Sequence, residues 1–127
     1  MFYRVIGVMS GSSLDGLDIA CVEFRFQAGK WEFSILSAEC FPYSDEWTSK
    51  LANSACLSAK DYLLLDAAYG HYIGQQIKSF MEKYDLQFKV SLITVHGHTS
   101  FHVPPKMTAQ LGDGAAIAAE TGLPVIT

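Results

Sequence analysis

The sequence predicts an α/β domain in which a mixed sheet is covered by helices. Three observations lead to this fold class: strand-like runs with short connections at the N-terminus, a long amphipathic helix after them, and alternating strand-like and helical segments in the remainder. The expected element order is β-β-β-α-α-β-(β)-α-β. The 127 residues are enough for one domain with a sizeable core.

Three apolar, β-branched runs predict the first strands. They cover residues 2–10, 17–27 and 30–41, and QAGK at 27–30 forms the turn between the last two. Sequential strands with short connections predict an antiparallel meander. The first run alternates imperfectly between apolar and polar residues, which predicts burial on both faces and a central position in the sheet.

Two helices are predicted next, each beginning at a serine. Ser44 is the expected N-cap of a helix over residues 45–55. Ser58 and Asp61 have capping-box spacing, with aspartate where glutamate is commoner, and the helix after them is predicted to continue to Tyr84.

The second helix carries an apolar stripe, which predicts that one side of it lies in the core. Gly70 and Gly74 lower its helix propensity and are expected to let another backbone approach closely. His71 is interpreted as a solvated or packing histidine rather than a ligand. The stripe consists of Leu65, Tyr69, Tyr72, Ile73, Ile77, Phe80 and Tyr84.

The remaining segments are predicted as a short buried strand, an irregular segment, an extended stretch, a short helix and the beginning of another buried strand. Asp113 is expected to cap this helix and Gly122 to end it. In chain order the five segments are residues 90–97, 98–107, 108–113, 114–121 and 123–127.

Composition excludes several classes of partner. The net charge is −4 and no cluster of lysine or arginine occurs, which argues against nucleic acid and anionic membrane surfaces. Cys21, Cys40 and Cys56 are widely spaced and suit a reducing compartment better than a disulfide framework. The apolar run near the N-terminus is too short for a signal peptide or a membrane span, so we expect a cytoplasmic protein.

The stretch VMSGSSLDGLDIA, residues 8–20, does not match the common phosphate loops. A Walker loop requires a lysine, and none lies in this stretch. The dinucleotide fingerprint requires G-x-G-x-x-G before a helix, whereas Gly11 and Gly16 have a different spacing and a strand follows them. The G-x-S-x-G pattern of a nucleophile elbow is also absent.

A hairpin turn of this composition can still hold a phosphate. Gly11 allows close approach to the backbone, successive N–H groups can form an anion nest, and Ser12 and Ser13 add hydroxyl donors. Asp15 would repel bare phosphate, so its presence makes sense mainly if Mg²⁺ lies between them. The alternative is an ordinary loop, because turns favour glycine, serine and aspartate.

Three sequence blocks carry a resemblance to a known family. GVMSGSSLDGLDIA is similar to the pattern G-x-M-S-G-T-S-x-D-G-x-D, with Ser12 in place of threonine. LITVHGHTSFHVP is similar to S-H-G-Q-T-x-x-H-x-P, with His98 in place of glutamine, and AQLGDGAAIAAETGLPVI is similar to L-Q-I-G-D-x-x-x-I-A-x-x-T-G-I-P-V-V. Together, and in this order, they resemble the anhydro-N-acetylmuramic acid kinases.

The resemblance implies a ribonuclease-H-like or actin-like ATPase domain that opens with a three-stranded meander. Kinases of this family open the 1,6-anhydro ring of a cell-wall amino sugar with water and phosphorylate its 6-hydroxyl from ATP, in peptidoglycan recycling. The implied cofactors are ATP and Mg²⁺, and the implied partners are ATP and the sugar. The resemblance is also compatible with a homodimer.

The same resemblance assigns the site residues. Asp15 is the implied Mg²⁺ partner, through water, and His98 leaves the exact sugar open because imidazole differs from glutamine in shape and can gain charge. The ATP phosphates are assigned to Gly11, Ser12, Ser13, Leu14, Asp15, Gly16, Leu17 and Asp18. The sugar is assigned to His96, Gly97, His98, Thr99, Gly112 and Asp113.

The family's kinases are considerably longer than this chain. Their second half carries the aspartate base and the adenine-binding segments, so the base is expected beyond Thr127. We therefore expect residues 1–127 to be a single N-terminal domain of a longer two-domain kinase, inactive by itself.

Two alternatives remain open. His96 and His98 lie two residues apart and would share one face of a strand, so they could hold a metal in a hydrolase together with His102 and Asp113. This arrangement requires residues 97–99 to remain in the strand. The other alternative is a non-catalytic binding domain of the same fold.

Overall fold

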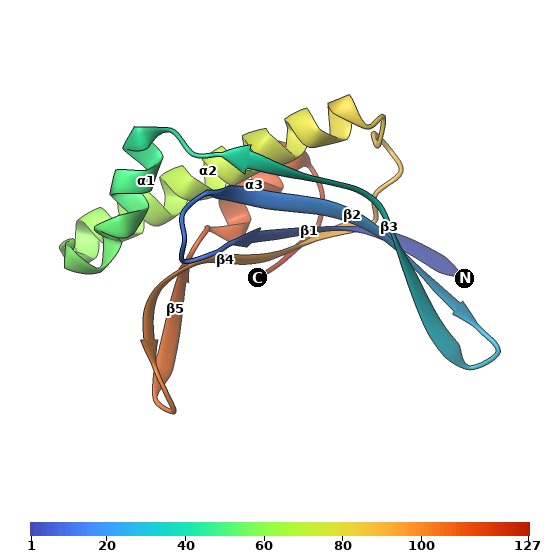
Figure 1. Ribbon diagram of the computed structural model, residues 1–127, viewed down its shortest axis with the longest axis horizontal. Helices are drawn as coiled ribbons and strands as arrows, with labels where there is room; N and C mark the ends of the chain where they lie inside the picture. The colour runs from blue at the N-terminus through green and yellow to red at the C-terminus, as the bar shows by residue number, and fades with distance from the viewer.

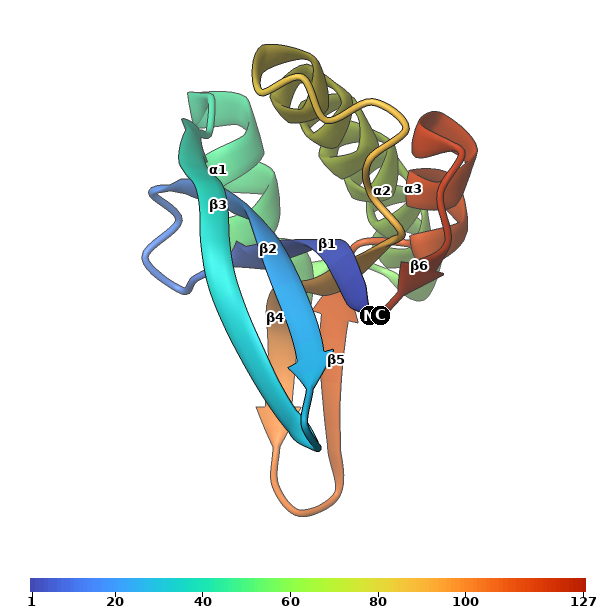
Figure 2. The same cartoon turned by 90° about the vertical axis from the view of Figure 1, so that its right-hand side faces the viewer.

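A six-stranded mixed sheet forms the centre of the fold, and the helices lie on one of its faces (Figures 1 and 2). The computed structural model describes residues 1–127. The elements are β1 (Phe2–Ser10), β2 (Gly16–Gln27), β3 (Lys30–Pro42), α1 (Asp45–Ala52), the 3₁₀ turn η1 (Ser54–Cys56), α2 (Ala59–Lys83), β4 (Leu92–Val103), β5 (Met107–Leu111), α3 (Gly114–Thr121) and β6 (Val125–Ile126). The predicted α/β class and element order are confirmed.

The strand order places β1 in the middle of the sheet. The path runs β3-β2-β1-β4-β5, and β6 pairs with β4. β2 is antiparallel to both β1 and β3, whereas β1 and β6 are parallel to β4. The predicted central position of the first strand is confirmed, but burial on both of its faces is wrong, because no helix covers the second face and Met9 is 51% exposed.

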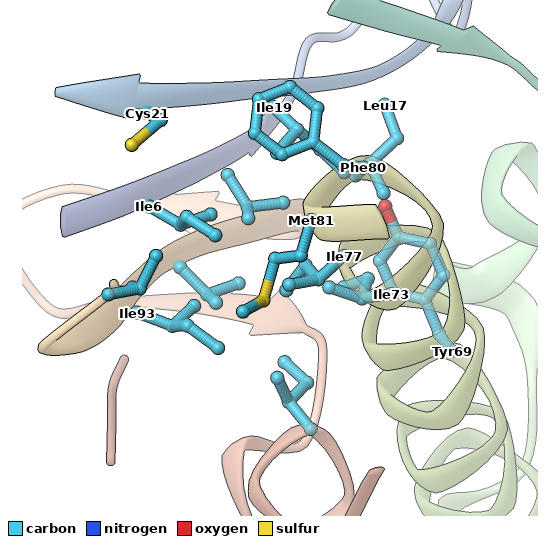
Figure 3. Close-up of a cluster of buried hydrophobic side chains, with 14 of the residues drawn as sticks. Ile6, Leu17, Ile19, Cys21, Tyr69, Ile73, Ile77, Phe80, Met81 and Ile93 are labelled. Atoms are coloured by element: carbon cyan, nitrogen blue, oxygen red, sulfur yellow. The ribbon is translucent and has the colours of Figure 1, made fainter. Parts of the chain in front are cut away.

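The core lies between the sheet and α2 (Figure 3). The predicted stripe faces inward, and Tyr69, Ile73, Ile77 and Phe80 are fully buried. The sheet contributes the opposing side chains, among them Ile6, Leu17, Ile19, Cys21 and Ile93. Fully burying an aliphatic or aromatic side chain of this kind stabilises a fold by about 1.5–3 kcal/mol.

The predicted helix caps are also present. The side chain of Ser44 accepts a hydrogen bond from the Trp47 N–H, and that of Ser58 from the Asp61 N–H. α1 ends at Ala52, earlier than predicted, and η1 follows it. No helix of the protein has the length and apolar character needed to cross a lipid bilayer.

Helix α3 packs against α2 where the two glycines leave room. A Cβ at Gly70 would lie 2.6 Å from the carbonyl oxygen of Asp113, and one at Gly74 would lie 2.5 Å from the Cβ of Glu120. The predicted close approach is therefore confirmed. His71 is exposed and lies 3.0 Å from the Glu120 carboxylate, so it contributes to the same helix contact.

The C-terminal segments differ in part from prediction. Residues 98–107 are not irregular: β4 continues to Val103 and forms a hairpin with β5, with Val103 paired to Met107 (Figure 1). The two prolines mark the tip of this hairpin rather than the end of regular structure. The final strand is present as β6, but Ile126 is 57% exposed and not buried.

No element covers the face of the sheet opposite α2 (Figure 2), and we call this face the open face. Apolar side chains lie exposed on it. Directly paired residues share a face, so the strand register maps this surface in rows. A row of mainly small side chains lies between two rows with larger ones. The rows are Tyr3–Phe24–Phe33, Leu92–Val5–Val22–Ile35, Ile126–Thr94–Gly7–Ala20–Ala38 and Met9–Asp18–Cys40.

The close contact between α2 and α3 yields a stability prediction. Glycine-to-alanine changes inside helices normally stabilise by about 1 kcal/mol, but at Gly70 the added methyl would meet backbone atoms of Asp113. We expect Gly70→Ala to lower the free energy of unfolding by about 1–3 kcal/mol, measured by urea denaturation. Gly7→Ala is the control, because its Cβ would have no neighbour nearer than 3.8 Å. Equal stability of the two variants would contradict the packing described.

Candidate functional site

The glycine-serine loop connects β1 to β2 as a tight turn. The Leu14 N–H donates to the carbonyl of Gly11 at 3.2 Å, and Leu14 has a positive φ of 57°. Ser12, Ser13 and Asp15 are exposed. The loop therefore presents two hydroxyls and one carboxylate to solvent.

Two residues of the predicted phosphate-binding set have clear structural roles. A Cβ at Gly16 would lie 2.5 Å from the carbonyl oxygen of Phe41, so glycine is required where β2 begins to pair with β3. Leu17 is fully buried in the core. These two positions can reach a ligand only through their backbone, whereas Asp18 is exposed on the open face.

The parallel pairing of β1 with β4 brings the loop next to the histidine block. Met9 is paired with Gly97 and Ser10 with His98. The Ser10 side chain is buried, and its Oγ lies 3.1 Å from Nδ1 of His98. The loop that begins at Gly11 therefore starts beside His98, although the two are far apart in the sequence.

The Gly112–Asp113 corner lies against the same part of β4. Gly97 has a φ of +74°, and a Cβ there would overlap the carbonyl oxygen of Leu111. Gly112 has a φ of +126°, and a Cβ there would lie 3.6 Å from the Cα of Gly97. Two glycines in the left-handed region thus let the two backbones meet.

Asp66 of α2 holds this corner in place. Its Oδ1 accepts a hydrogen bond from the Gly112 N–H at 2.7 Å, and its carbonyl accepts one from the Asp113 N–H at 3.3 Å. Burial raises the pKa of Asp66, and the Gly112 hydrogen bond opposes that effect. No sequence motif pointed to Asp66. The available signal was an acidic residue within the apolar stretch LLLDAAYG.

Most of the predicted sugar-binding residues line a pocket of about 380 Å³, which we call the corner pocket. Its lining includes His96, Gly97, Gly112 and Asp113, together with Asp66 and Gln110. Gln110 was also missed by the sequence analysis. Its amide donates to Thr99 Oγ1 at 3.2 Å, which connects the predicted Thr99 to the pocket wall.

A second hollow of about 800 Å³ lies on the open face, and we call it the open-face hollow. Asp18, Cys40 and His96 are among its lining residues, and His96 also lines the corner pocket, so the two adjoin. Burial raises the pKa of the Cys40 thiol, and the Asp18 carboxylate raises it further. Asp15 does not line this hollow.

The two histidines proposed for a metal-dependent hydrolase, His96 and His98, do not form a shared metal site. Both remain in β4, but the register shifts between Val8–Val95 and Met9–Gly97, which inserts a bulge at His96. His96 is exposed, whereas His98 is buried and bonded to Ser10. No group of three or more His, Cys, Asp or Glu side chains is arranged to hold a metal ion, so His96, His98, His102 and Asp113 do not form the expected cluster.

Comparison with known proteins identifies the family. The family model described as anhydro-N-acetylmuramic acid kinase matches residues 3–127. A curated protein of that name from Picosynechococcus sp. is 36% identical over 132 residues. Those from Sulfurimonas denitrificans and Paramagnetospirillum magneticum are 31% identical over 128 residues and 32% identical over 124 residues, respectively. The alignments cover 98%, 96% and 95% of this chain, which spans about a third (34%) of the length of each relative. Because the family model extends over nearly the whole chain, the chain belongs to the anhydro-N-acetylmuramic acid kinase family.

Proposed function

We propose that this chain is the N-terminal part of an ATP-dependent kinase. The kinase opens the 1,6-anhydro ring of anhydro-N-acetylmuramic acid with water and phosphorylates its 6-hydroxyl, in peptidoglycan recycling in the cytoplasm. Family membership supports the reaction. The observation that carries the site assignment is the pairing of Ser10 with His98, because it brings the glycine-serine loop and the histidine block to one place in the sheet.

In this proposal the loop contacts the ATP phosphates. Its backbone N–H groups and the exposed Ser12 and Ser13 hydroxyls are the donors. Asp15 and Asp18 make no ion pair with a lysine or arginine, so no protein cation neutralises these carboxylates, and carboxylate oxygens suit a hard cation such as Mg²⁺. Asp15 would hold Mg²⁺ through water, and the metal would neutralise charge on the phosphate oxygens.

The corner pocket is the proposed sugar site. Asp113 contributes a carboxylate and His96 an imidazole, and the backbone of Gly97 and Gly112 forms part of the lining. Such mixed donors and acceptors suit hydroxyl and amide groups. His98 and Thr99 lie on the same stretch of β4 and complete the proposed set.

We also propose an actin-like or ribonuclease-H-like ATPase domain as the fold family. In support, three antiparallel strands are followed by a helix and then by strands parallel to β1. Residues 1–127 would form one domain of a two-domain kinase, with the general base and the second wall of the nucleotide site in the remaining two thirds. That remainder would also cover the open face.

If the glycine-serine loop binds the ATP phosphates, the kinase should need Asp15 for efficient turnover of Mg-ATP. In a full-length kinase that contains this segment, Asp15→Ala should lower kcat/KM for Mg-ATP by about 10- to 100-fold, as is typical when a group that acts through metal-bound water is removed. KM for the sugar should change little. The measurement is steady-state kinetics with each substrate varied and Mg²⁺ titrated.

Glu32→Ala is the matched control for this experiment, because Glu32 is an exposed carboxylate near the far end of the β2–β3 hairpin. It should leave both kinetic parameters unchanged. An unaltered Mg²⁺ dependence in Asp15→Ala would show that the loop does not bind the metal–phosphate complex. Asp18→Ala tests the alternative carboxylate on the open face.

His98 predicts a pH dependence of stability. Burial lowers its pKa below the ordinary value of about 6.5, so protonation is less favourable in the folded protein than in the unfolded chain. This stabilising contribution is complete above about pH 6.5 and is lost as the pH falls toward the folded pKa. Urea denaturation between pH 7.5 and 5 should therefore show a decrease that is smaller in His98→Gln. Parallel profiles for the two proteins would show that burial does not perturb His98.

The chain alone is expected to fold but not to phosphorylate the sugar. Loss of a general base typically lowers the rate by about 10²–10⁴-fold, and loss of one wall of the site removes positioning as well. The exposed apolar rows of the open face should make the chain self-associate. Incubation of the purified chain with Mg-ATP and the anhydro sugar tests activity, and sedimentation tests association. Phosphosugar above background, with host kinases excluded, would contradict the proposal.

A further inference from the structure

We propose that a row of hydroxyl groups fixes the tautomer of His98, so that its free ring nitrogen, Nε2, is always a hydrogen-bond donor. The hydroxyls belong to Tyr69, Tyr43 and Ser10, and we call them the hydroxyl relay. The inference deepens the proposed function and rests on it for the identity of the ligand, because His98 belongs to the proposed sugar site. The relay itself rests on the contacts within the protein.

The relay connects four segments of the fold. Tyr69 is in α2, Tyr43 lies between β3 and α1, Ser10 ends β1 and His98 is in β4. The hydroxyls of Tyr69 and Tyr43 are 2.5 Å apart, and Tyr43 donates to Ser10 Oγ at 2.8 Å. Ser10 Oγ is 3.1 Å from Nδ1 of His98. Tyr69, Ser10 and His98 are all buried.

The number of hydroxyl protons determines which group donates and which accepts in each hydrogen bond of the relay. Ser10 has one hydroxyl proton, and its two side-chain partners are Tyr43 and His98. Tyr43 already donates to Ser10, so His98 Nδ1 is the partner left to accept the Ser10 proton. The opposite arrangement would leave a buried hydroxyl proton unpaired, which is unfavourable. Similarly, Tyr43 uses its own proton on Ser10 and therefore accepts from Tyr69.

This direction determines where the proton of His98 lies. Nδ1 accepts a hydrogen bond and carries no proton, so a neutral imidazole must carry its proton on Nε2. Burial lowers the pKa of His98, which favours the neutral ring. Burial also raises the pKa values of Tyr43 and Tyr69, so both hydroxyls remain protonated donors.

The other ring nitrogen, Nε2, makes no hydrogen bond within the protein. In the proposed site it is the ring atom left to bond a ligand. The group that it recognises must be an acceptor, such as a carbonyl, carboxylate or ether oxygen of an amino sugar. A side-chain amide at this position could present a donor or an acceptor by rotation, whereas His98 presents only a donor. Ser10 is therefore a positioning residue for specificity.

The tautomer can be measured directly in the chain itself. Long-range ¹H–¹⁵N correlation spectra of the ¹⁵N-labelled protein at pH 8 report the protonation of each histidine nitrogen, and the His98 signals are assigned by their loss in His98→Gln. We expect an unprotonated Nδ1 and a protonated Nε2. Ser10→Ala removes the donor to Nδ1, so it should move the Nδ1 signal away from the acceptor position and increase the Nδ1–H form. In Tyr43→Phe the Ser10 hydroxyl still has His98 as its acceptor, so the tautomer should not change.

Tyr72→Phe is the matched control. Its ring packs 6.0 Å from that of Tyr43, but its hydroxyl makes no hydrogen bond to the protein, so the His98 signals should not change. A proton on Nδ1 in the unmodified protein would overturn the relay. So would an unchanged tautomer in Ser10→Ala while the rest of the spectrum remains that of a folded protein.

Kinetics then separate the relay from the proposed function. In a full-length kinase, Ser10→Ala should raise KM for the anhydro sugar by about 3- to 10-fold, the effect of one weakened hydrogen bond. Tyr72→Phe should leave KM unchanged. A confirmed tautomer with an unchanged KM in Ser10→Ala would leave the relay intact and contradict the placement of the sugar at His98.

Discussion

The parallel pairing of β1 with β4 is the constraint on which the rest of this structure depends. Parallel neighbours cannot be joined by a tight turn. Here the β2–β3 hairpin follows β1, and α1 and α2 then form the crossover that brings the chain from β3 to β4. The pairing sets the register that places Ser10 beside His98. It also makes β1 central, so the loop that follows β1 begins in the interior of the sheet rather than at an edge.

The crossover also explains why the two faces of the sheet differ. α2 covers one face along its whole length, and α3 is added beside α2 through Gly70 and Gly74, so it does not cross to the other face (Figure 2). The open face consequently keeps large exposed side chains, such as Phe33 at 70% and Ile35 at 63%. A surface of this kind is expected where further polypeptide packs, which agrees with relatives about three times as long.

Local rules account for what the sequence predicted well. Ser44, Ser58 and Asp113 cap helices because a side-chain oxygen can satisfy a free N–H in the first turn, and this requires only neighbouring residues. The stripe of α2 follows from helical periodicity alone. These rules gave the element order and one side of the core.

Contacts between distant segments account for what the sequence did not predict. The β4–β5 hairpin was missed because Val103 and Met107 pair across two prolines that, read locally, indicate an irregular stretch. The bulge at His96 separates two histidines whose spacing suggested a shared face, and it arises from the register with β1. Asp66 was missed because its role depends on a glycine corner that approaches α2 from much later in the chain.

The charges around the site limit how the chain could act in phosphoryl transfer. No lysine or arginine lines the open-face hollow or the corner pocket, whereas Asp18, Asp66 and Asp113 contribute carboxylates. Polyanionic ATP would be repelled by these groups unless a cation intervened. Backbone N–H groups and hydroxyls are the donors that the chain offers, and they orient a phosphate better than they neutralise it. In the proposed kinase the segment would therefore be suited to positioning, and the positive field would come from a divalent cation or from residues outside this chain.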